Sequence, residues 1–301
     1  MAEAKIDGLG VALVTPFRED LSIDYKSLGT IIEHIISGGC DYIVVLGTTA
    51  ETPTLSLREK EEVARFICDI TAGRVPLVIG IGGNNTKGVI DDIKSRNLTG
   101  YSAILSVTPY YNKPTQEGLF QHFKAIAEAS PLPILLYNVP GRTGVNLTAK
   151  TTLRLARFSD KFCGIKEASG KLDQCEEIIK DAPAHFKVIS GDDALVSKMM
   201  RIGGKGVISV LANAYPAVMK KMVEDCQNSR QENADMCQEK LLPLIRDIFE
   251  DGNPAGVKAI LARMGMIRNV LRLPLVTVSK EVEKKLEKEM GLIGLNFEML
   301  R

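Results

Sequence analysis

Hydrophobic residues along the chain form eight short runs, and each run is followed by a longer segment with apolar positions at helical spacing. Runs such as residues 43–46 and 134–136 are apolar at every position, which is typical of parallel strands covered on both faces. The runs recur roughly every thirty residues, the size of a βαβ unit. The predicted strands cover residues 8–16, 42–48, 76–83, 102–109, 133–140, 162–169, 187–193 and 206–213.

The segments between these strands have the pattern of amphipathic helices. In residues 56–71, charged positions 59–62 lie opposite the apolar residues Val63 and Ile67. Ser56 is followed three residues later by Glu59, which is the spacing of a capping box and predicts a helix start. Residues 119–129 and 172–180 have similar helical patterns.

Eight consecutive strand–helix units predict an α/β fold, a closed (β/α)8 TIM barrel. An open doubly wound sheet is disfavoured, because such sheets usually have fewer strands and no Gly-x-Gly-x-x-Gly follows the first strand. From about Tyr215 onward only helices are predicted, at residues 217–227, 232–250, 254–266 and 280–290. We therefore expect a barrel at residues 1–229 that carries the active site. Residues 230–301 should form a C-terminal all-helical extension, which we interpret as an assembly surface.

Composition excludes several classes of function. The 301 residues carry a net charge of +1, which gives no electrostatic reason to expect binding to nucleic acid or to an anionic membrane. No apolar run is long enough to span a bilayer, and the first residues lack the apolar core of a signal peptide. Six scattered cysteines without a Cys-x-x-Cys pair indicate reduced thiols and a cytoplasmic location.

Unusual polar residues occur where the predicted strands end. In a TIM barrel these C-terminal ends and the loops after them carry the chemistry. Each residue alone could be a helix cap, a surface charge or loop packing, but their common placement on one rim favours a site. They are Thr48, Thr49, Asn84, Tyr110, Tyr111, Tyr137, Arg142, Lys166, Asp192, Asp193 and Asn213.

Lys166 lies within an otherwise apolar and small-residue run, residues 162–169, apart from its neighbour Glu167. A buried ammonium group is costly, and a lysine that loses its proton becomes a nucleophile for carbonyl carbons. The alternative is a structural ion pair with Glu167. Adjacent side chains on a strand point to opposite faces, so such a pair is poorly placed.

Other catalytic chemistries lack their residues. The histidines, His34, His122 and His185, lie in predicted helices or at the far end of a strand, so neither a zinc site nor a Ser-His-Asp arrangement is expected. No Gly-rich phosphate cradle follows the last two strands. What remains is amine chemistry by Lys166 on a carbonyl substrate, with nearby hydroxyls to move protons. Arg142 could hold a carboxylate through two parallel hydrogen bonds.

Five motifs carry a specific resemblance to a known family. They are Gly47-Thr48-Thr49-x-Glu51, the segment from Thr108 to Pro114, the segment from Tyr137 to Gly144, Gly164-Ile165-Lys166-Glu167-Ala168 and Gly191-Asp192-Asp193. The chain resembles the pyruvate-dependent class I aldolases, a family that includes dihydrodipicolinate synthases and N-acetylneuraminate lyases. Within that family it is most similar to the synthases, over almost its whole length.

The resemblance implies a lyase in which Lys166 forms a Schiff base with pyruvate. The enamine would add to L-aspartate 4-semialdehyde and give 4-hydroxy-tetrahydrodipicolinate, in the first committed step of diaminopimelate and lysine biosynthesis. The covalent imine would replace any cofactor, and no metal is implied. The implied proton relay is Thr48, Tyr137 and Tyr111, with Tyr111 serving the neighbouring subunit of a homotetramer built as a dimer of dimers.

The resemblance also implies binding roles. Thr49 would hold the pyruvate carboxylate, Arg142 the carboxylate of the aldehyde, and the carbonyls of Gly191 and Ile208 would line the site. Arg142 separates the synthases from the neuraminate lyases, whose second substrate is a sugar. Two alternatives remain: another pyruvate-dependent aldolase or lyase acting on a sugar acid or hydroxy acid, and a barrel that has lost catalysis and serves as a scaffold.

Asn84 and Tyr110 match the effector cleft at which many family members bind L-lysine. Leu57 and Lys60 stand where inhibited members commonly carry histidines, and Gly88 stands where they carry glutamate. Ala50 replaces a glycine that is frequent in the second-strand motif, which is a mild change. Loss of an acidic partner and gain of a cation disfavour a cationic effector, so weak or absent inhibition by L-lysine is expected.

Overall fold

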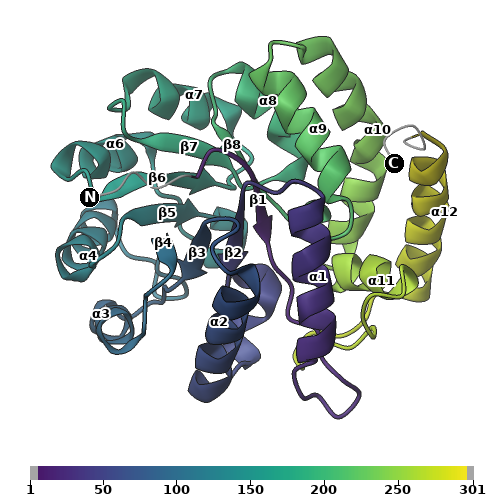
Figure 1. Cartoon of the computed structure of the whole chain (residues 1–301). Coiled ribbons are helices and arrows are strands. Elements are labelled where there is room, and N and C mark those ends of the chain that lie inside the picture. The colour runs from purple at the N-terminus through teal and green to yellow at the C-terminus, as the bar shows by residue number, and fades with distance from the viewer. Residues whose placement is uncertain (1–5, 297–301) are drawn as a thin grey trace.

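Eight parallel strands close into a barrel in sequence order, with β1 paired to both β2 and β8 (Figure 1). The computed structural model describes residues 6–296. The strands are β1 Gly8–Ala12, β2 Tyr42–Val45, β3 Leu77–Gly80, β4 Tyr101–Val107, β5 Ile134–Asn138, β6 Phe162–Glu167, β7 Lys187–Ser190 and β8 Gly206–Ser209. The TIM-barrel prediction is confirmed. Most strands end a few residues before the predicted runs do, and the remaining residues form loops at the rim.

Helices surround the barrel, and three further helices follow it. They are α1 Tyr25–Ser37, α2 Leu57–Thr71, α3 Thr86–Ser95, α4 Gln116–Ala129, α5 Pro140–Thr143, α6 Ala149–Phe158, α7 Leu172–Asp181, α8 Val196–Arg201, α9 Pro216–Gln227, α10 Gln231–Glu250, α11 Ala255–Arg263 and α12 Lys280–Asn296. The predicted capping box is present at the start of α2, where the Ser56 and Glu59 side chains each bond the other's backbone N–H.

Alternation along each strand produces two hydrophobic layers. On β2, Tyr42 and Val44 face the barrel interior, whereas Ile43 and Val45 pack in the larger layer beneath the helices. Both faces are therefore dry, which explains the continuous apolar runs of the sequence. Gly10 has a steric reason to lack a side chain, because a Cβ atom there would lie 2.3 Å from the Tyr42 ring.

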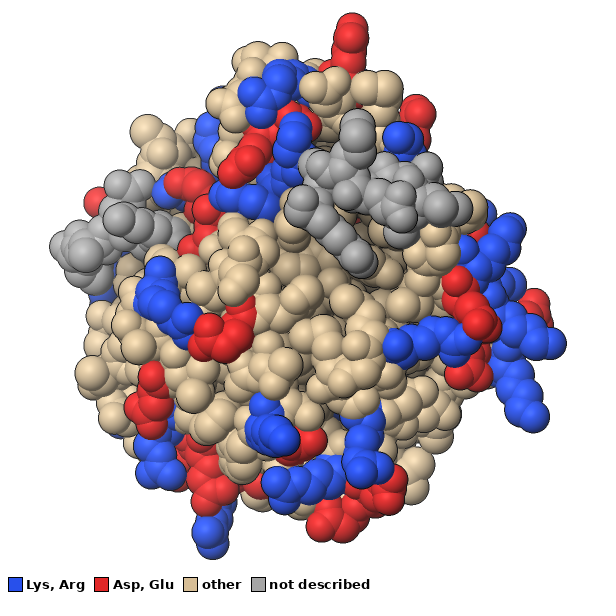
Figure 2. Space-filling view, turned by 45° about the vertical axis from the view of Figure 1, so that its right-hand side comes forward, with Lys and Arg blue, Asp and Glu red and all other residues tan. Residues whose placement is uncertain are grey.

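The C-terminal extension packs directly on the barrel. Helix α10 contacts α8 and α9, and α12 lies across α10 and α11 on the side of the molecule away from β4 and β5 (Figure 1). We propose the division between barrel and extension at residues 229 and 230. No helix in the described part of the chain is both long and apolar enough to cross a membrane. Figure 2 shows basic and acidic side chains interspersed around the edge of one face, with uncharged atoms across its centre.

Candidate active site

A cavity of about 1030 Å³ lies at the C-terminal ends of the strands. The barrel contributes residues from the loops or ends of β2, β5, β6, β7 and β8 to its lining. They are Thr48, Thr49, Tyr137, Val139, Gly141, Arg142, Lys166, Ala168, Gly191, Asp192, Ala194 and Val210. Six predicted site residues, Thr48, Thr49, Tyr137, Arg142, Lys166 and Gly191, therefore meet in one cavity although they are up to 143 positions apart in the sequence.

Lys166 lies on β6 with its side chain in the cavity and is only 6 % exposed. It pairs in register with Tyr137 of β5, so both side chains point to the barrel interior. The Nζ atom lies 4.4 Å from the centroid of the Tyr137 ring. Among the described residues, no carboxylate lies within ion-pair distance of this amine. A buried amine beside a phenol, facing an open cavity, is the arrangement that carbonyl chemistry requires.

Glu167 faces the opposite way, into the layer between strands and helices. Its carboxylate accepts hydrogen bonds from Asn138 Nδ2 at 3.0 and 3.1 Å, from Gln174 Nε2 at 2.9 Å and from the Ser169 backbone N–H at 2.7 Å. The carboxylate is thus fully used in tying β5, β6 and α7 together. The alternative in which Lys166 and Glu167 form a structural pair is excluded.

Gly191 follows β7 and lies against the lysine side chain. A Cβ atom at this position would lie 2.7 Å from Ala168 Cβ and 3.1 Å from both Cγ and Cε of Lys166. Only glycine therefore leaves the Lys166 side chain in its present path. The carbonyl of Ile208 was expected to line the site near Lys166. The Ile208 side chain is buried in the barrel interior on β8, and the residue is not among those that line the cavity.

Thr48 and Thr49 lie in a short 3-10 turn, Thr48–Ala50, between two residues with left-handed backbone. Leu46 has φ 56° and Glu51 has φ 54°, conformations that cost free energy in residues other than glycine. Glu51 is buried and forms an ion pair with the fully buried Lys258 of α11. Its other oxygen accepts the backbone N–H of Arg272 at 3.0 Å. The motif glutamate therefore anchors the threonine turn to the C-terminal extension.

The extension also forms one wall of the cavity, which the sequence did not predict. The residues involved are Leu242, Ile245, Arg246, Phe249 and Glu250 of α10, and Asn253 in the turn before α11. The helical spacing of 242, 245, 246 and 249 gave a signal for one common face of α10. Nothing in the sequence indicated that this face meets the barrel rim.

Tyr111, Asn84 and Tyr110 do not line the cavity of their own chain. Tyr111 is 89 % exposed and has φ 71°, so its side chain is held out on the surface loop between β4 and α4. Asn84 Nδ2 donates to the Tyr110 carbonyl oxygen at 3.3 Å, which places these two residues together in one surface cluster. An exposed tyrosine on a strained loop is available to a neighbouring molecule and not to its own Lys166.

The side chains of two polar residues expected at the rim form hydrogen bonds with the backbone of their own chain. Asp193 is buried and accepts the backbone N–H groups of Val210 and Leu211 at 2.9 and 3.0 Å, and burial raises the pKa of its carboxyl group. Asn213 closes the barrel seam: it donates to the Ala12 carbonyl at 2.8 Å and accepts the Val14 N–H at 3.1 Å.

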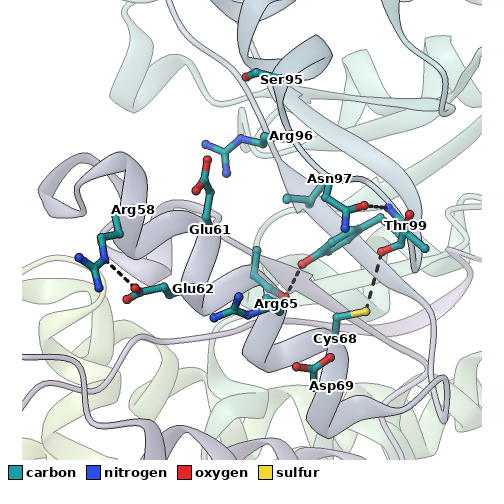
Figure 3. Close-up of a pocket in the computed structure, with 13 residues that line it drawn as sticks. Arg58, Glu61, Glu62, Arg65, Cys68, Asp69, Ser95, Arg96, Asn97 and Thr99 are labelled. Atoms are coloured by element: carbon teal, nitrogen blue, oxygen red, sulfur yellow. Dashed lines mark hydrogen bonds and ion pairs between the residues drawn. The ribbon is translucent and has the colours of Figure 1, made fainter.

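A second cavity, of about 640 Å³, lies between α2 and the residues that lead from α3 to β4 (Figure 3). Charged side chains line it, and several are held by local pairs, such as Arg58 with Glu62 at 2.8 Å and Arg96 with Asp92 at 2.6 Å. No predicted site residue lines this cavity. It is a feature of the outer helical layer, separate from the barrel mouth.

The buried His122 and Cys163 side chains lie outside the cavity lining. In the described part of the chain no three His, Cys, Asp or Glu side chains are grouped to hold a metal ion. Burial lowers the pKa of His122 to about 4, and it raises the pKa of the Cys163 thiol to about 12. A neutral imidazole packed among helices and a thiol of high pKa are structural groups.

Comparison with known proteins agrees with this geometry. The sequence pattern of the dihydrodipicolinate synthetase family matches residues 5–291. The 4-hydroxy-tetrahydrodipicolinate synthase of Parabacteroides distasonis is 51% identical over 295 residues, 98% of this chain and 99% of the relative. The solved dihydrodipicolinate synthase of Thermotoga maritima has a TM-score of 0.93 at 38% identity, covering 96% and 99% of the two chains. A solved monomeric dihydrodipicolinate synthase variant also has a TM-score of 0.93 at 38% identity, covering 96% and 97%. Both its sequence and its fold place this chain in the dihydrodipicolinate synthetase family.

Proposed function

We propose that this chain is a lyase that condenses pyruvate with L-aspartate 4-semialdehyde to give 4-hydroxy-tetrahydrodipicolinate, in the first committed step of diaminopimelate and lysine biosynthesis. One observation carries the proposal: the buried Lys166 amine faces the cavity beside Tyr137 without a carboxylate partner among the described residues. Family membership and the names of the curated relatives agree with it.

The reaction begins with attack of the Lys166 amine on the keto carbon of pyruvate. Loss of one water gives an imine, and removal of a methyl proton gives the enamine. The enamine carbon forms a new bond to the aldehyde carbon of the second substrate, whose oxygen takes up a proton and becomes the 4-hydroxyl group. The substrate's amino group then attacks the imine carbon, displaces Lys166 and closes the ring. The covalent imine supplies the electron sink, so the proposal needs neither a metal nor an added cofactor.

The rim residues divide the remaining work. Tyr137 lies against the lysine and would be the proton donor and acceptor nearest the reacting carbon, with Thr48 lining the same cavity. The Thr49 hydroxyl, which lines the same cavity, would bind the pyruvate carboxylate. The Arg142 guanidinium, on an exposed residue that lines the cavity, is suited to bind the carboxylate of the aldehyde substrate with paired hydrogen bonds. Gly191 lies against the Lys166 side chain, and the carbonyls of Gly191 and Ile208 would line the site near Lys166.

Tyr111 could take part in the reaction only if the protein forms an oligomer, in which it would reach the active site of a neighbouring subunit. Its exposure and its absence from the cavity lining of its own chain support a role in the active site of a neighbouring subunit. We therefore propose a homotetramer, a dimer of dimers, in which Thr48, Tyr137 and the neighbour's Tyr111 form the proton relay. All six cysteines are free thiols, which fits a cytoplasmic enzyme.

Borohydride trapping tests the proposal directly. Incubation with pyruvate and sodium borohydride should add the mass of a reduced pyruvate adduct to a peptide that contains Lys166, and Lys166→Ala should abolish the adduct. Tyr137→Phe should keep pyruvate binding and lower turnover by roughly 10²-fold or more. An unmodified wild-type chain would favour the scaffold alternative. An adduct without turnover of aspartate semialdehyde would favour a related aldolase, against which Arg142 argues.

A further inference from the structure

Asn253 reaches the active site from the C-terminal extension and contacts a substrate-binding hydroxyl. Its Nδ2 atom donates a hydrogen bond to Thr49 Oγ1 at 3.0 Å. The two residues are 204 positions apart, and both line the cavity. This contact is the point at which the extension touches a residue that we assign to substrate binding.

The contact sets the direction of the Thr49 hydroxyl. A threonine hydroxyl has one hydrogen to donate and two lone pairs to accept. Because Asn253 donates, it occupies a lone pair and leaves the O–H hydrogen free. Within the described residues no side chain or carbonyl accepts that hydrogen, and Thr49 is too deeply buried to be generally hydrated. A ligand carboxylate in the cavity is therefore its natural acceptor.

The surroundings hold Asn253 in place. It lies in the turn between α10 and α11, where Gly252 has φ 91°. The two helices are in close contact, since a Cβ atom on Gly256 would lie 2.2 Å from the Ile248 carbonyl oxygen. Lys258, one turn into α11, binds Glu51 beside the same threonine turn. The ion pair between Lys258 and Glu51 therefore holds Asn253 and Thr49 close together, in addition to their own hydrogen bond.

The Asn253 Oδ1 atom is buried and has no hydrogen-bond partner among the described residues. The amide's side-chain bonding to the protein is therefore through Nδ2 alone, and a substitution that changes only the NH₂ group isolates the contact with Thr49.

We infer that Asn253 is a positioning residue that fixes the Thr49 hydroxyl as a donor toward the carboxylate of the 2-oxo acid substrate. The inference rests on the proposed function and adds to it a residue of the extension.

Asn253→Asp is the decisive variant because it keeps the shape and the Oδ1 acceptor and replaces the donor by a second acceptor. The introduced carboxylate would take the Thr49 hydrogen for itself, so the KM for pyruvate should rise roughly 10-fold or more. The maximal rate of borohydride trapping at saturating pyruvate should change much less. Asn228→Asp, the same substitution at an exposed residue on the protein surface, is the matched control and should leave the KM for pyruvate unchanged.

A double-mutant cycle separates positioning from simple charge repulsion. In a Thr49→Val background the hydroxyl is absent, so adding Asn253→Asp should raise the KM for pyruvate by less than about 2-fold. A full 10-fold effect in that background would mean that the new charge acts directly on pyruvate, and it would overturn the inference. An unchanged KM in the single variant would overturn it as well.

A second variant and a measurement on the wild-type chain distinguish misfolding from loss of the proposed contact. If Asn253→Asp does not fold, as judged by circular dichroism, Asn253→Ala removes the donor without adding charge. Its KM for pyruvate should still rise, by a smaller factor, and an unchanged value would overturn the inference. Trapping of pyruvate on the wild-type chain tests the proposed function itself. A wild-type adduct together with unaffected variants therefore refutes the role of Asn253 alone.

Discussion

Replacing Lys258 with methionine removes the cation from an ion pair in which both side chains are 0 % exposed. The Glu51 carboxylate would keep the Arg272 backbone N–H but lose its ion-pair partner. The Val270 carbonyl, which accepts from Lys258 at 3.0 Å, would lose that donor as well. Lys258 Nζ also lies 4.3 Å from the centroid of the Phe17 ring, a contact that methionine replaces only in part.

The lost ion pair determines how far the free energy of unfolding should fall. Removing one partner of a buried ion pair costs about 3–5 kcal/mol, because an uncompensated charge remains in the interior. The pair itself is not a large source of stability: desolvation lowers the pKa of Lys258 to about 8 in spite of Glu51. We therefore expect Lys258→Met to lower the free energy of unfolding by about 4 kcal/mol. The double variant Glu51→Gln with Lys258→Met should recover roughly half of that loss.

Urea unfolding followed by far-ultraviolet circular dichroism measures the effect, since the chain contains no tryptophan. With a slope of about 3 kcal/mol per molar urea for a chain of this size, the midpoint should fall by roughly 1 M. Protein concentration must be the same for all variants, because the proposed subunit association would contribute to stability. A Lys258→Met variant within about 1 kcal/mol of wild type, or a double variant less stable than the single one, would refute the reasoning.

Four further outcomes follow from the structure. Gly191→Ala should slow trapping of pyruvate at least about 10-fold with an unchanged circular dichroism spectrum, because its Cβ would press on Lys166; normal trapping would contradict this. Arg142→Lys should raise the KM for aspartate semialdehyde roughly 10-fold and that for pyruvate much less, since lysine lacks the paired donors; equal effects would argue against the assignment. Bonding to the Arg272 guanidinium lowers the pKa of Glu59 from 4.5 to about 2, so this stabilisation is present above pH 4.5 and is lost as the pH falls toward 2. Glu59→Gln should therefore cost about 2 kcal/mol at pH 7, allowing for partial exposure, and almost nothing at pH 2; a pH-independent loss would count against the linkage. Micromolar L-lysine should leave the rate unchanged, and clear inhibition in that range would show that the altered cleft still binds the effector.

The local pattern of the sequence was sufficient for the elements of the fold. Strands buried on both faces must be continuously apolar, and in helices with one buried face the apolar residues must repeat every 3.6 positions. Both patterns can therefore be recognised from residues close together in the sequence. The capping box at Ser56 is likewise a local feature. The strand ends were set too late because residues such as Leu46 and Thr48 continue the apolar or β-branched pattern although the backbone already turns.

Some residues of the candidate site could be predicted from local sequence, and others depend on tertiary packing. Lys166, Tyr137, Thr48 and Arg142 were predictable because a barrel brings all strand ends to one rim, whatever their separation in sequence. The cavity wall from α10 and the contact between Asn253 and Thr49 were not, because they depend on how the extension packs back on the barrel. A periodic apolar face shows that a helix is buried, but it does not identify the surface that buries it.

The sequence by itself determined which residues could do chemistry: a lysine in an apolar strand, hydroxyls and an arginine at strand ends, and few histidines. The tertiary structure decided which of them have partners. Glu167 accepts hydrogen bonds from Asn138 and Gln174, and Glu51 forms an ion pair with Lys258. The Lys166 amine instead faces an open cavity. The physical reason is that hydrogen bonds and ion pairs are made in space, between groups as many as 251 positions apart, whereas propensity and periodicity act between neighbours.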